Sequence, residues 1–365
     1  MSNYYLILAW IAFFGFLTLI GQMYRTEKVN GKTEWRIHPL WATVLVLPLV
    51  IWTANRGYVA DTGAYMRMFE ELPTSFGEIA GYMSGVEKDR GFYYISAVIK
   101  SLITQDVTVY FLILAAVQAY LLFRVYRKYS TRYVLSFFLF IVSTDYVSWM
   151  FNGIRQFTAV SITLLAFEYI LNKNYVKAII IVLIASLFHQ SALLVIPFIF
   201  IVQGKAWNAR TLLFIFMAIV IVTSVEQFTG VLDTMLQETQ YENVVSDWVE
   251  GGDDGTNALR VLVYAVPTII SLIGLRYIKA ADNKVINICT NMSIASTGFY
   301  FISMFTSGIF IGRLPIYFSL YNYILLPWEI DNMFEEYSAR IVYAAMMIAY
   351  LGFYIIQIHF IWGFA

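Results

Sequence analysis

Five short polar clusters interrupt a sequence that is otherwise strongly apolar, and each contains at least one ionisable side chain. A charged group at membrane depth costs about 2.5–3.5 kcal/mol on insertion scales, so such groups within apolar sequence favour a functional interpretation. The clusters are Asn55-Arg56 with Asp61 and Tyr65, Asp89-Arg90-Gly91-Phe92, Asn152-Gly153-Ile154-Arg155-Gln156, Phe188-His189-Gln190-Ser191, and Gly312-Arg313 with Tyr317.

Three arginines are candidates for binding an anion such as a diphosphate. Arg155 stands at the start of a predicted helix, where backbone N–H groups favour an anion and a guanidinium fork binds phosphate through two donors. Arg313 lies deep in an apolar run, where its side chain has less room to snorkel, and Arg56 directly follows another apolar run. The alternatives are a snorkelling arginine at Arg155 and an interfacial anchor at Arg56.

Proton transfer has two candidates, His189 and Asp61. Asp61 stands four residues before Tyr65, so the two share a face if the segment is helical, and a carboxylate there can orient or deprotonate a hydroxyl. The alternative for Asp61 is an exposed loop carboxylate or a partner for Arg56, and for His189 a hydrogen-bonded core histidine. Further candidates for substrate binding are Tyr65, Asp89, Gln156 and Tyr317.

The composition requires these residues to be positioned by membrane helices. The 365 residues are 60% hydrophobic and 13% charged, with mean hydropathy +0.67, against about 45–50% and 25% in soluble domains. Spanning helices take roughly 20 residues each, because the backbone must satisfy its own hydrogen bonds in lipid. The sequence therefore predicts an all-α polytopic membrane protein with a single integral membrane domain over residues 1–365.

Metal and nucleic-acid chemistry have no sequence signature. The single cysteine, Cys289, excludes an internal disulfide and argues against a thiolate metal site. There is no Cys/His metal spacing, no Gly-rich phosphate loop and no nucleic-acid motif in the sequence. We therefore expect no metal, no cofactor and no nucleic-acid partner.

Basic connections predict the topology. By the positive-inside rule they lie in the cytoplasm, which gives about 12 membrane segments, both termini outside, and all five polar clusters on the extracytoplasmic face. Basic connections lie on both sides of the apolar run 178–203, so a single crossing would place one of them outside the cytoplasm. We therefore predict that the run forms two short helices, which make a hairpin near His189. The basic connections are 25–36, 124–132, 173–177, 205–210 and 276–284.

Two long extracytoplasmic loops, 55–107 and 226–258, follow from this topology. In the first, the capping-box spacing of Ser75 and Glu78 predicts a short helix over 76–84. A second helix over about 91–103 would place Phe92, Ile95, Val98, Ile99 and Leu102 on one face. Loop 226–258 has no Lys or Arg and is predicted to lie over a site.

The five polar motifs, in their order along the chain, resemble those of the EpsG family of Wzy-like exopolysaccharide and O-antigen polymerases. The resemblance implies a GT-C-like glycosyltransferase of the bacterial cytoplasmic membrane, which joins polyprenyl-diphosphate-linked oligosaccharides at the extracytoplasmic face. Its partners would be the lipid bilayer and the lipid-linked donor and acceptor, and a protein that regulates chain length is a further candidate. The matching stretches are NRGYVADTGAYMRMF (55–69), DRGFYYISAVIK (89–100), GIRQFTAVSI (153–162), SLFHQSALLVIPF (186–198) and GRLPIYF (312–318).

The chemistry of the candidate residues agrees with such a transfer. Arg155, Arg313 and Arg56 would stabilise the departing diphosphate without a metal, and His189 or Asp61 would accept the proton of the acceptor hydroxyl. Another lipid-linked glycosyltransferase or ligase is the nearest alternative. A membrane O-acyltransferase and a flippase of lipid-linked sugars stay open as well, although transporters commonly show two related halves and this sequence shows no internal repeat.

Overall fold

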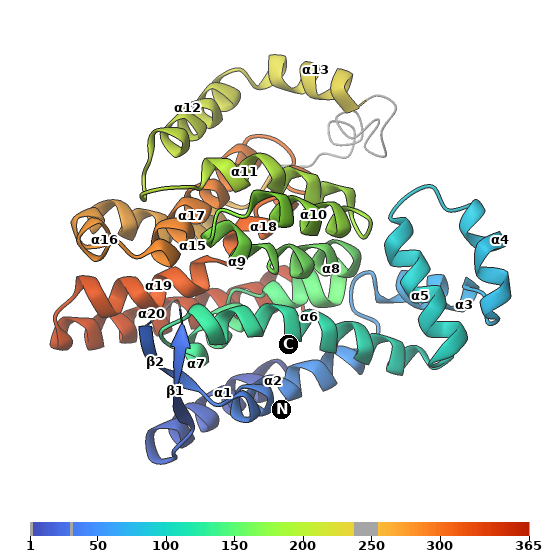
Figure 1. Ribbon diagram of the computed structural model, residues 1–365, viewed down its shortest axis with the longest axis horizontal. Coiled ribbons are helices and arrows are strands. Elements are labelled where there is room, and N and C mark those ends of the chain that lie inside the picture. Colours follow the sequence, from blue (N-terminus) through green and yellow to red (C-terminus); the bar gives the residue numbers. More distant parts are fainter. Residues whose placement is uncertain (1–2, 30–31, 237–254, 365) are drawn as a thin grey trace. The chain divides into compact units, whose positions relative to one another are not determined.

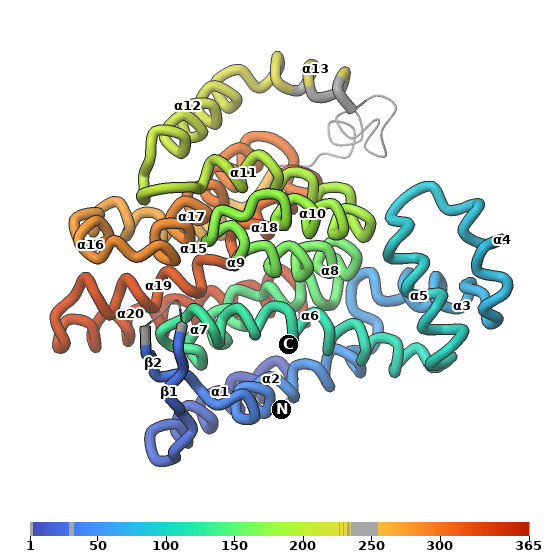
Figure 2. The backbone as a smooth tube through the Cα atoms, viewed as in Figure 1, coloured from blue at the N-terminus to red at the C-terminus, as the bar shows by residue number. Residues whose placement is uncertain are grey.

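The computed structural model describes residues 3–29, 32–236 and 255–364, and it is 77% helical (Figures 1 and 2). It contains two compact units, which we describe separately. Unit 1 comprises Met1–Ile196 and Tyr337–Ala365, and unit 2 comprises Pro197–Glu336. The expectation of one domain over 1–365 stays a prediction.

Unit 1 is built around α6, which packs against α2 and against α8. Asp106 caps the N-terminus of α6 by accepting hydrogen bonds from the backbone N–H groups of Thr108 and Val109. Its helices are α1 (Asn3–Ile20), α2 (Pro39–Ala54), α3 (Thr62–Glu71), α4 (Ile79–Ser84), α5 (Arg90–Leu102), α6 (Val107–Tyr129), α7 (Tyr133–Val142), α8 (Ile154–Thr163), α9 (Ala166–Leu171), α10 (Tyr175–Ser186) and α20 (Glu336–Ile356), with short 3-10 or π segments η1 (Phe76–Glu78), η2 (Tyr146–Asn152), η3 (Gln190–Leu194) and η5 (Gln357–Ile361).

Unit 2 is centred on α17, which packs against α12, α15, α18 and α19. This helix is buried along most of its length, which explains why small and polar residues such as Ser293 and Asn291 interrupt its apolar sequence. Its elements are α11 (Val195–Ile201, which begins in unit 1), α12 (Ala209–Thr223), α13 (Val225–Leu236), α15 (Ala258–Ile273), α16 (Leu275–Ala281), α17 (Lys284–Met304), η4 (Ile311–Arg313), α18 (Ile316–Ser319) and α19 (Asn322–Met333).

The helices identify a membrane protein. Within the described residues, five are long and apolar enough to cross a bilayer, or up to seven if two bent pairs each count as one span. The number of about 12 segments is not confirmed, because several predicted segments are shorter or broken helices. For example, α2 has 16 residues, which span about 24 Å against a hydrocarbon core of about 30 Å.

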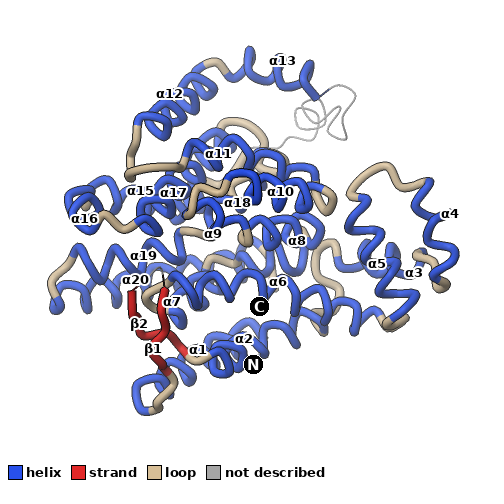
Figure 3. Tube along the Cα trace, viewed as in Figure 1, coloured by secondary structure: helices blue, strands red, loops and turns tan. Residues whose placement is uncertain are grey.

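The basic connection 25–36 folds as a β-hairpin, which the sequence analysis did not predict (Figure 3). Strands β1 (Tyr24–Val29) and β2 (Lys32–Ile37) pair antiparallel, with Glu27 opposite Glu34. One face packs on the helices, since Arg127 Nη1 lies 2.9 Å from Glu27 Oε1. The opposite face leaves Trp35 69% exposed.

In the 55–107 loop, both predicted helices form, as η1 with α4 and as α5. Ser75 makes no side-chain capping bond. Of the residues predicted to share one face of α5, Phe92 and Ile99 are buried, whereas Ile95 and Leu102 are 39% and 62% exposed. The buried face of α5 also includes Ser96, whose hydroxyl lies 2.8 Å from the Tyr110 hydroxyl on α6, and Lys100, whose ammonium donates to the Phe69 carbonyl on α3.

The long apolar run 178–203 is broken where predicted. Helix α10 ends at Ser186 and η3 begins at Gln190, with His189 in extended backbone between them. Loop 226–258 begins as α13, and residues 237–254 lie outside the described residues. The prediction that this loop lies over a site is therefore untested.

Candidate functional site

An ion pair links two of the predicted motifs in unit 1. Arg155, in the first turn of α8, donates from Nη1 to Asp89 Oδ2 at 2.8 Å. Asp89 is only 4% exposed, whereas Arg155 is 37% exposed. A buried carboxylate is expensive unless a cation compensates it, so this pair must form for the loop to dock on α8.

Asp89 itself carries signs of strain. Its backbone lies in the left-handed region, with φ +50°, which is uncommon for a residue with a side chain. Its Oδ1 atom is buried and has no hydrogen-bond partner of normal geometry among the described residues. Burial raises the pKa of this carboxyl, and the Arg155 guanidinium followed by the Gln190 backbone N–H opposes that shift. Such features cluster at functional sites, where the surrounding structure compensates for them.

Tyr65 joins the pair from α3. Its buried hydroxyl interacts with the Arg155 guanidinium, and its ring packs edge-on against Phe92, with centroids 6.3 Å apart. Burial raises the pKa of Tyr65, opposed by the Arg155 charge, so the hydroxyl stays neutral at physiological pH. A neutral phenol can both donate and accept a hydrogen bond beside the cation.

A close backbone contact brings the His189 motif to the same place. The Gly91 N–H donates to the Leu187 carbonyl at 2.8 Å. A Cβ at Gly91 would lie 2.8 Å from Leu187 Cβ and 2.9 Å from Leu187 O, so only glycine fits. Residues 89–91 are thereby fixed against the chain break that holds His189.

The two candidates for proton transfer differ in their surroundings. His189 is half-buried, and its Nδ1 lies 2.7 Å from Ser191 Oγ. Asp61 is exposed at the N-terminus of α3, and its backbone N–H donates to Asn152 Oδ1 at 3.3 Å. The predicted helix with Tyr65 is present, since the Tyr65 N–H donates to the Asp61 carbonyl at 3.1 Å.

Arg56 is held by contacts inside the protein. Its Nε donates to Thr62 Oγ1 at 2.9 Å, its Nη1 donates to the Thr53 carbonyl at 2.8 Å, and its guanidinium carbon lies 4.1 Å from the centre of the Phe111 ring. Burial lowers the pKa of Arg56 to about 10, so it remains charged at neutral pH. These contacts tie the end of α2 to the start of α3. Gln156, on α8, is buried as well.

The fifth motif lies in unit 2. Arg313 ends η4 and is exposed, and Tyr317 on α18 is 2% exposed. A Cβ at Gly312 would lie 2.5 Å from Thr256 Oγ1, and the Thr256 N–H donates to the Ser303 carbonyl at 2.9 Å. Unit 1 thus assembles four of the predicted clusters, and a shared site for Arg155 and Arg313 stays a prediction.

A comparison with known protein families identifies the family of this chain. The model of the EpsG family matches residues 40–362 of the 365, a range that contains all the candidate residues. The chain belongs to the EpsG family. No curated protein and no solved structure matches it significantly. Membership in the EpsG family and the apolar helices together indicate polysaccharide biosynthesis at a membrane.

The sequence analysis missed two features of this EpsG-family protein that position the site. One is the π-helical segment η2, which ends at Asn152, three residues before Arg155, and follows Thr144, whose φ is +61°. The other is Lys100, whose ammonium donates to the carbonyls of Phe69 and Leu72 at the end of α3. The Asn-Gly pair at 152–153 was a signal for a backbone irregularity. Nothing in the sequence distinguishes Lys100 from a surface lysine.

Proposed function

We propose that this EpsG-family protein is a polysaccharide polymerase that transfers glycan between polyprenyl-diphosphate-linked oligosaccharides at the extracytoplasmic face of the bacterial cytoplasmic membrane. The observation that carries the proposal is the assembly of Arg155, Asp89 and Tyr65 beside the His189 break. In the proposal the chain has about 12 membrane segments and a GT-C-like architecture, although some segments are too short to cross alone.

In this reaction, a hydroxyl oxygen of the acceptor glycan attacks the anomeric carbon of the donor. The bond between that carbon and the diphosphate oxygen breaks, and the lipid diphosphate leaves with the bonding electron pair. The hydroxyl proton passes to His189 or to Asp61. The growing negative charge on the diphosphate is the part of the transition state that fixed cations stabilise most.

Arg155 is the residue best placed to bind that charge. Asp89 accepts a hydrogen bond from one N–H of the Arg155 guanidinium, and Tyr65 interacts with the same guanidinium. These contacts fix the orientation of the guanidinium plane and leave its other N–H groups available to a ligand. A guanidinium held in this way needs no reorganisation when the diphosphate charge develops. Arg313 is proposed as a further residue that binds the diphosphate, and the buried Arg56 would add positive potential at longer range. Gln156 and Tyr317 remain proposed contacts for the glycan.

The test is incubation of the purified protein with defined lipid-linked repeat units. We expect a ladder of glycan products and one lipid diphosphate released for each bond formed, at a rate that a metal chelator leaves unchanged. Absence of a ladder with a competent donor would contradict the proposal. A ladder that stops on chelation would overturn only its metal-free form.

The orientation is testable because the only cysteine, Cys289, is buried. The exposed positions Gln190 and Asn172 lie on opposite sides of the membrane in the predicted topology. A membrane-impermeant maleimide should label Gln190→Cys in intact spheroplasts and label Asn172→Cys only after lysis. The reverse pattern would place the His189 motif in the cytoplasm and favour an acyltransferase instead.

A further inference from the structure

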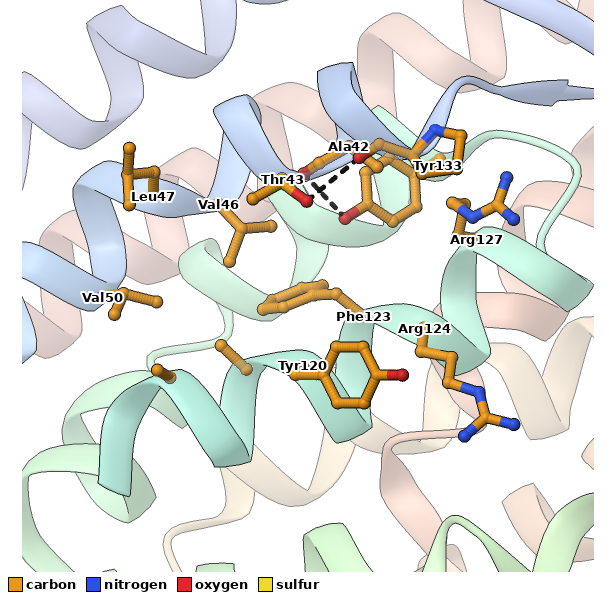
Figure 4. A pocket seen from close by; sticks show the side chains of 13 residues that line it. Ala42, Thr43, Val46, Leu47, Val50, Tyr120, Phe123, Arg124, Arg127 and Tyr133 are labelled. Atoms are coloured by element: carbon orange, nitrogen blue, oxygen red, sulfur yellow. Dashed lines mark hydrogen bonds between the residues drawn. The ribbon is translucent and has the colours of Figure 1, made fainter. Parts of the chain in front are cut away.

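A cavity of about 440 Å³ lies between α2 and α6 in unit 1, a size typical of sites for small ligands, about 300–1,000 Å³ (Figure 4). Its walls are mainly aliphatic, with Val46 and Val50 on α2 facing Ala116 and Ala119 on α6. The two alanines leave the space that larger residues would fill. We call this cavity the α2–α6 groove.

The groove opens at the protein surface between α2 and α6, a surface that we expect to meet lipid. At its rim, Leu47 is 48% exposed and Tyr120 is 65% exposed, and Ala116 is exposed too. An apolar chain can therefore enter from the bilayer without unfolding a helix. An aromatic side chain with a polar tip, such as Tyr120, is typical of the membrane interface.

One end of the groove is basic. Figure 4 shows Arg124 and Arg127 near Tyr133, away from Leu47 and Val50 at the other end. The two arginines are not equivalent. Arg127 is committed to the Glu27 carboxylate and to the Ile37 carbonyl. Arg124 is exposed and has no hydrogen-bond or ion-pair partner within the part of the chain that the structure describes.

We propose that the α2–α6 groove binds an anionic phospholipid, with one acyl chain between the helices and the phosphate on Arg124. The charge favours this occupant, because an apolar slot that ends in one uncommitted guanidinium matches an amphiphile with a negative head. The predicted topology agrees, since Arg124 belongs to a cytoplasmic connection and the cytoplasmic leaflet carries the anionic lipids.

This site is distinct from the one around Arg155. Phe111, which stacks on Arg56 near that site, precedes Arg124 by 13 positions on the same helix, or about 20 Å along its axis. A diphosphate bound at Arg155 therefore does not reach Arg124. The proposal stands whether or not the protein is a polymerase.

The test uses the purified full chain in detergent and native mass spectrometry. Phosphatidylglycerol and phosphatidylcholine with identical acyl chains are added in equal amounts. The wild-type protein should retain phosphatidylglycerol in preference, and Arg124→Gln should reduce that preference about fivefold, the effect of one basic side chain near an anionic surface. The matched control is Arg276→Gln on α16, another exposed arginine that is predicted to be cytoplasmic.

A second pair of variants tests the groove itself. Ala116→Trp places a large ring in the slot and should abolish retention of both phospholipids. Ala12→Trp, at an exposed position of α1 outside the groove, should leave retention unchanged. Thermal unfolding midpoints within a few degrees of wild type would show that the lost lipid does not reflect unfolding.

Three results would overturn the proposal. The first is equal retention of the two phospholipids by the wild-type protein. The second is a preference that Arg124→Gln does not change. The third is displacement of phosphatidylglycerol by a polyprenyl phosphate whose binding is lost in Ala116→Trp and unchanged in Arg124→Gln. That result would assign the groove to the polyprenyl chain of the lipid-linked substrate.

Discussion

Two ion pairs of unit 1 have almost the same length and very different surroundings. Arg155 and Asp89 are 2.8 Å apart, and Lys128 and Glu168 are 2.7 Å apart. Asp89 is 4% exposed, while Glu168 is 47% exposed. The exposed pair can separate into solvent at little cost, whereas separating the buried pair leaves an uncompensated carboxylate. Length alone therefore does not distinguish a pair built into a site from a surface contact.

Their neighbours explain why only one of the two pairs is part of the candidate site. Around Asp89 the backbone is strained, a glycine permits a close contact, and three loop helices pack on one apolar cluster that includes Tyr65, Phe92 and Ile154. Lys128 and Glu168 connect the end of α6 to α9 without any of these features. The following predictions test this contrast, from the largest expected effect to the smallest.

The Gly91 contact should be the most sensitive point. In Gly91→Ala, the new methyl group meets the backbone of Leu187, which cannot move as a flexible side chain can. We expect a loss of about 3 kcal/mol in unfolding free energy, at the upper end for overpacking, and a lower polymerisation rate. Gly81→Ala is the control, because a Cβ there meets nothing within 4 Å. Equal effects in denaturant unfolding would show that the close contact is unimportant.

A comparison of two lysines sharpens the contrast. Lys100 is 7% exposed and donates to three carbonyls, with N–O distances of 2.7 or 2.8 Å. Lys100→Met leaves those carbonyls without their donor and should cost about 2 kcal/mol. Lys128→Met removes the exposed pair and should cost about 0–1 kcal/mol. Unfolding midpoints in one detergent check both, and a larger loss in Lys128→Met would reverse our interpretation of burial.

The smallest effect concerns pH. Burial raises the pKa of Asp89, so the folded protein binds its proton more tightly than the unfolded chain. Its contribution to stability is therefore present at low pH and lost as pH rises through the native pKa. Relative to the wild type, Asp89→Asn should become more stable as pH increases above about 4. Thermal unfolding of both proteins over a pH series measures this trend, and a stability difference that does not vary with pH would contradict it.

The sequence predicted features that depend on local pattern and charge. The break before Gln190 followed from basic residues on both sides of one long apolar run, and α5 followed from its spacing of apolar residues. The family was recognisable from the order of motifs such as 89–100 and 153–162, and the family comparison confirms it.

Features that depend on distant partners were not predictable. Lys100 is buried because the carbonyl end of α3 accepts its protons, which no local pattern reveals. The β-hairpin forms from a charged segment in which Glu27 finds Arg127 on α6, 100 positions later in the chain. The number of about 12 segments stays a prediction for a similar reason, because apolar length alone does not tell a complete span from a short or bent helix.

The central claim is that Arg155 stabilises the departing lipid diphosphate, and the direct test is the rate of product-ladder formation in three variants. We predict that Arg155→Ala lowers this rate about 10²–10³-fold and that Arg155→Lys retains part of it. The control, Arg67→Ala at an exposed arginine on α3, should match the wild type. Adding Asp89→Asn to Arg155→Ala should restore stability by removing the buried charge, without restoring the rate. Full turnover in Arg155→Ala, or recovery of the rate in the double variant, would contradict the account.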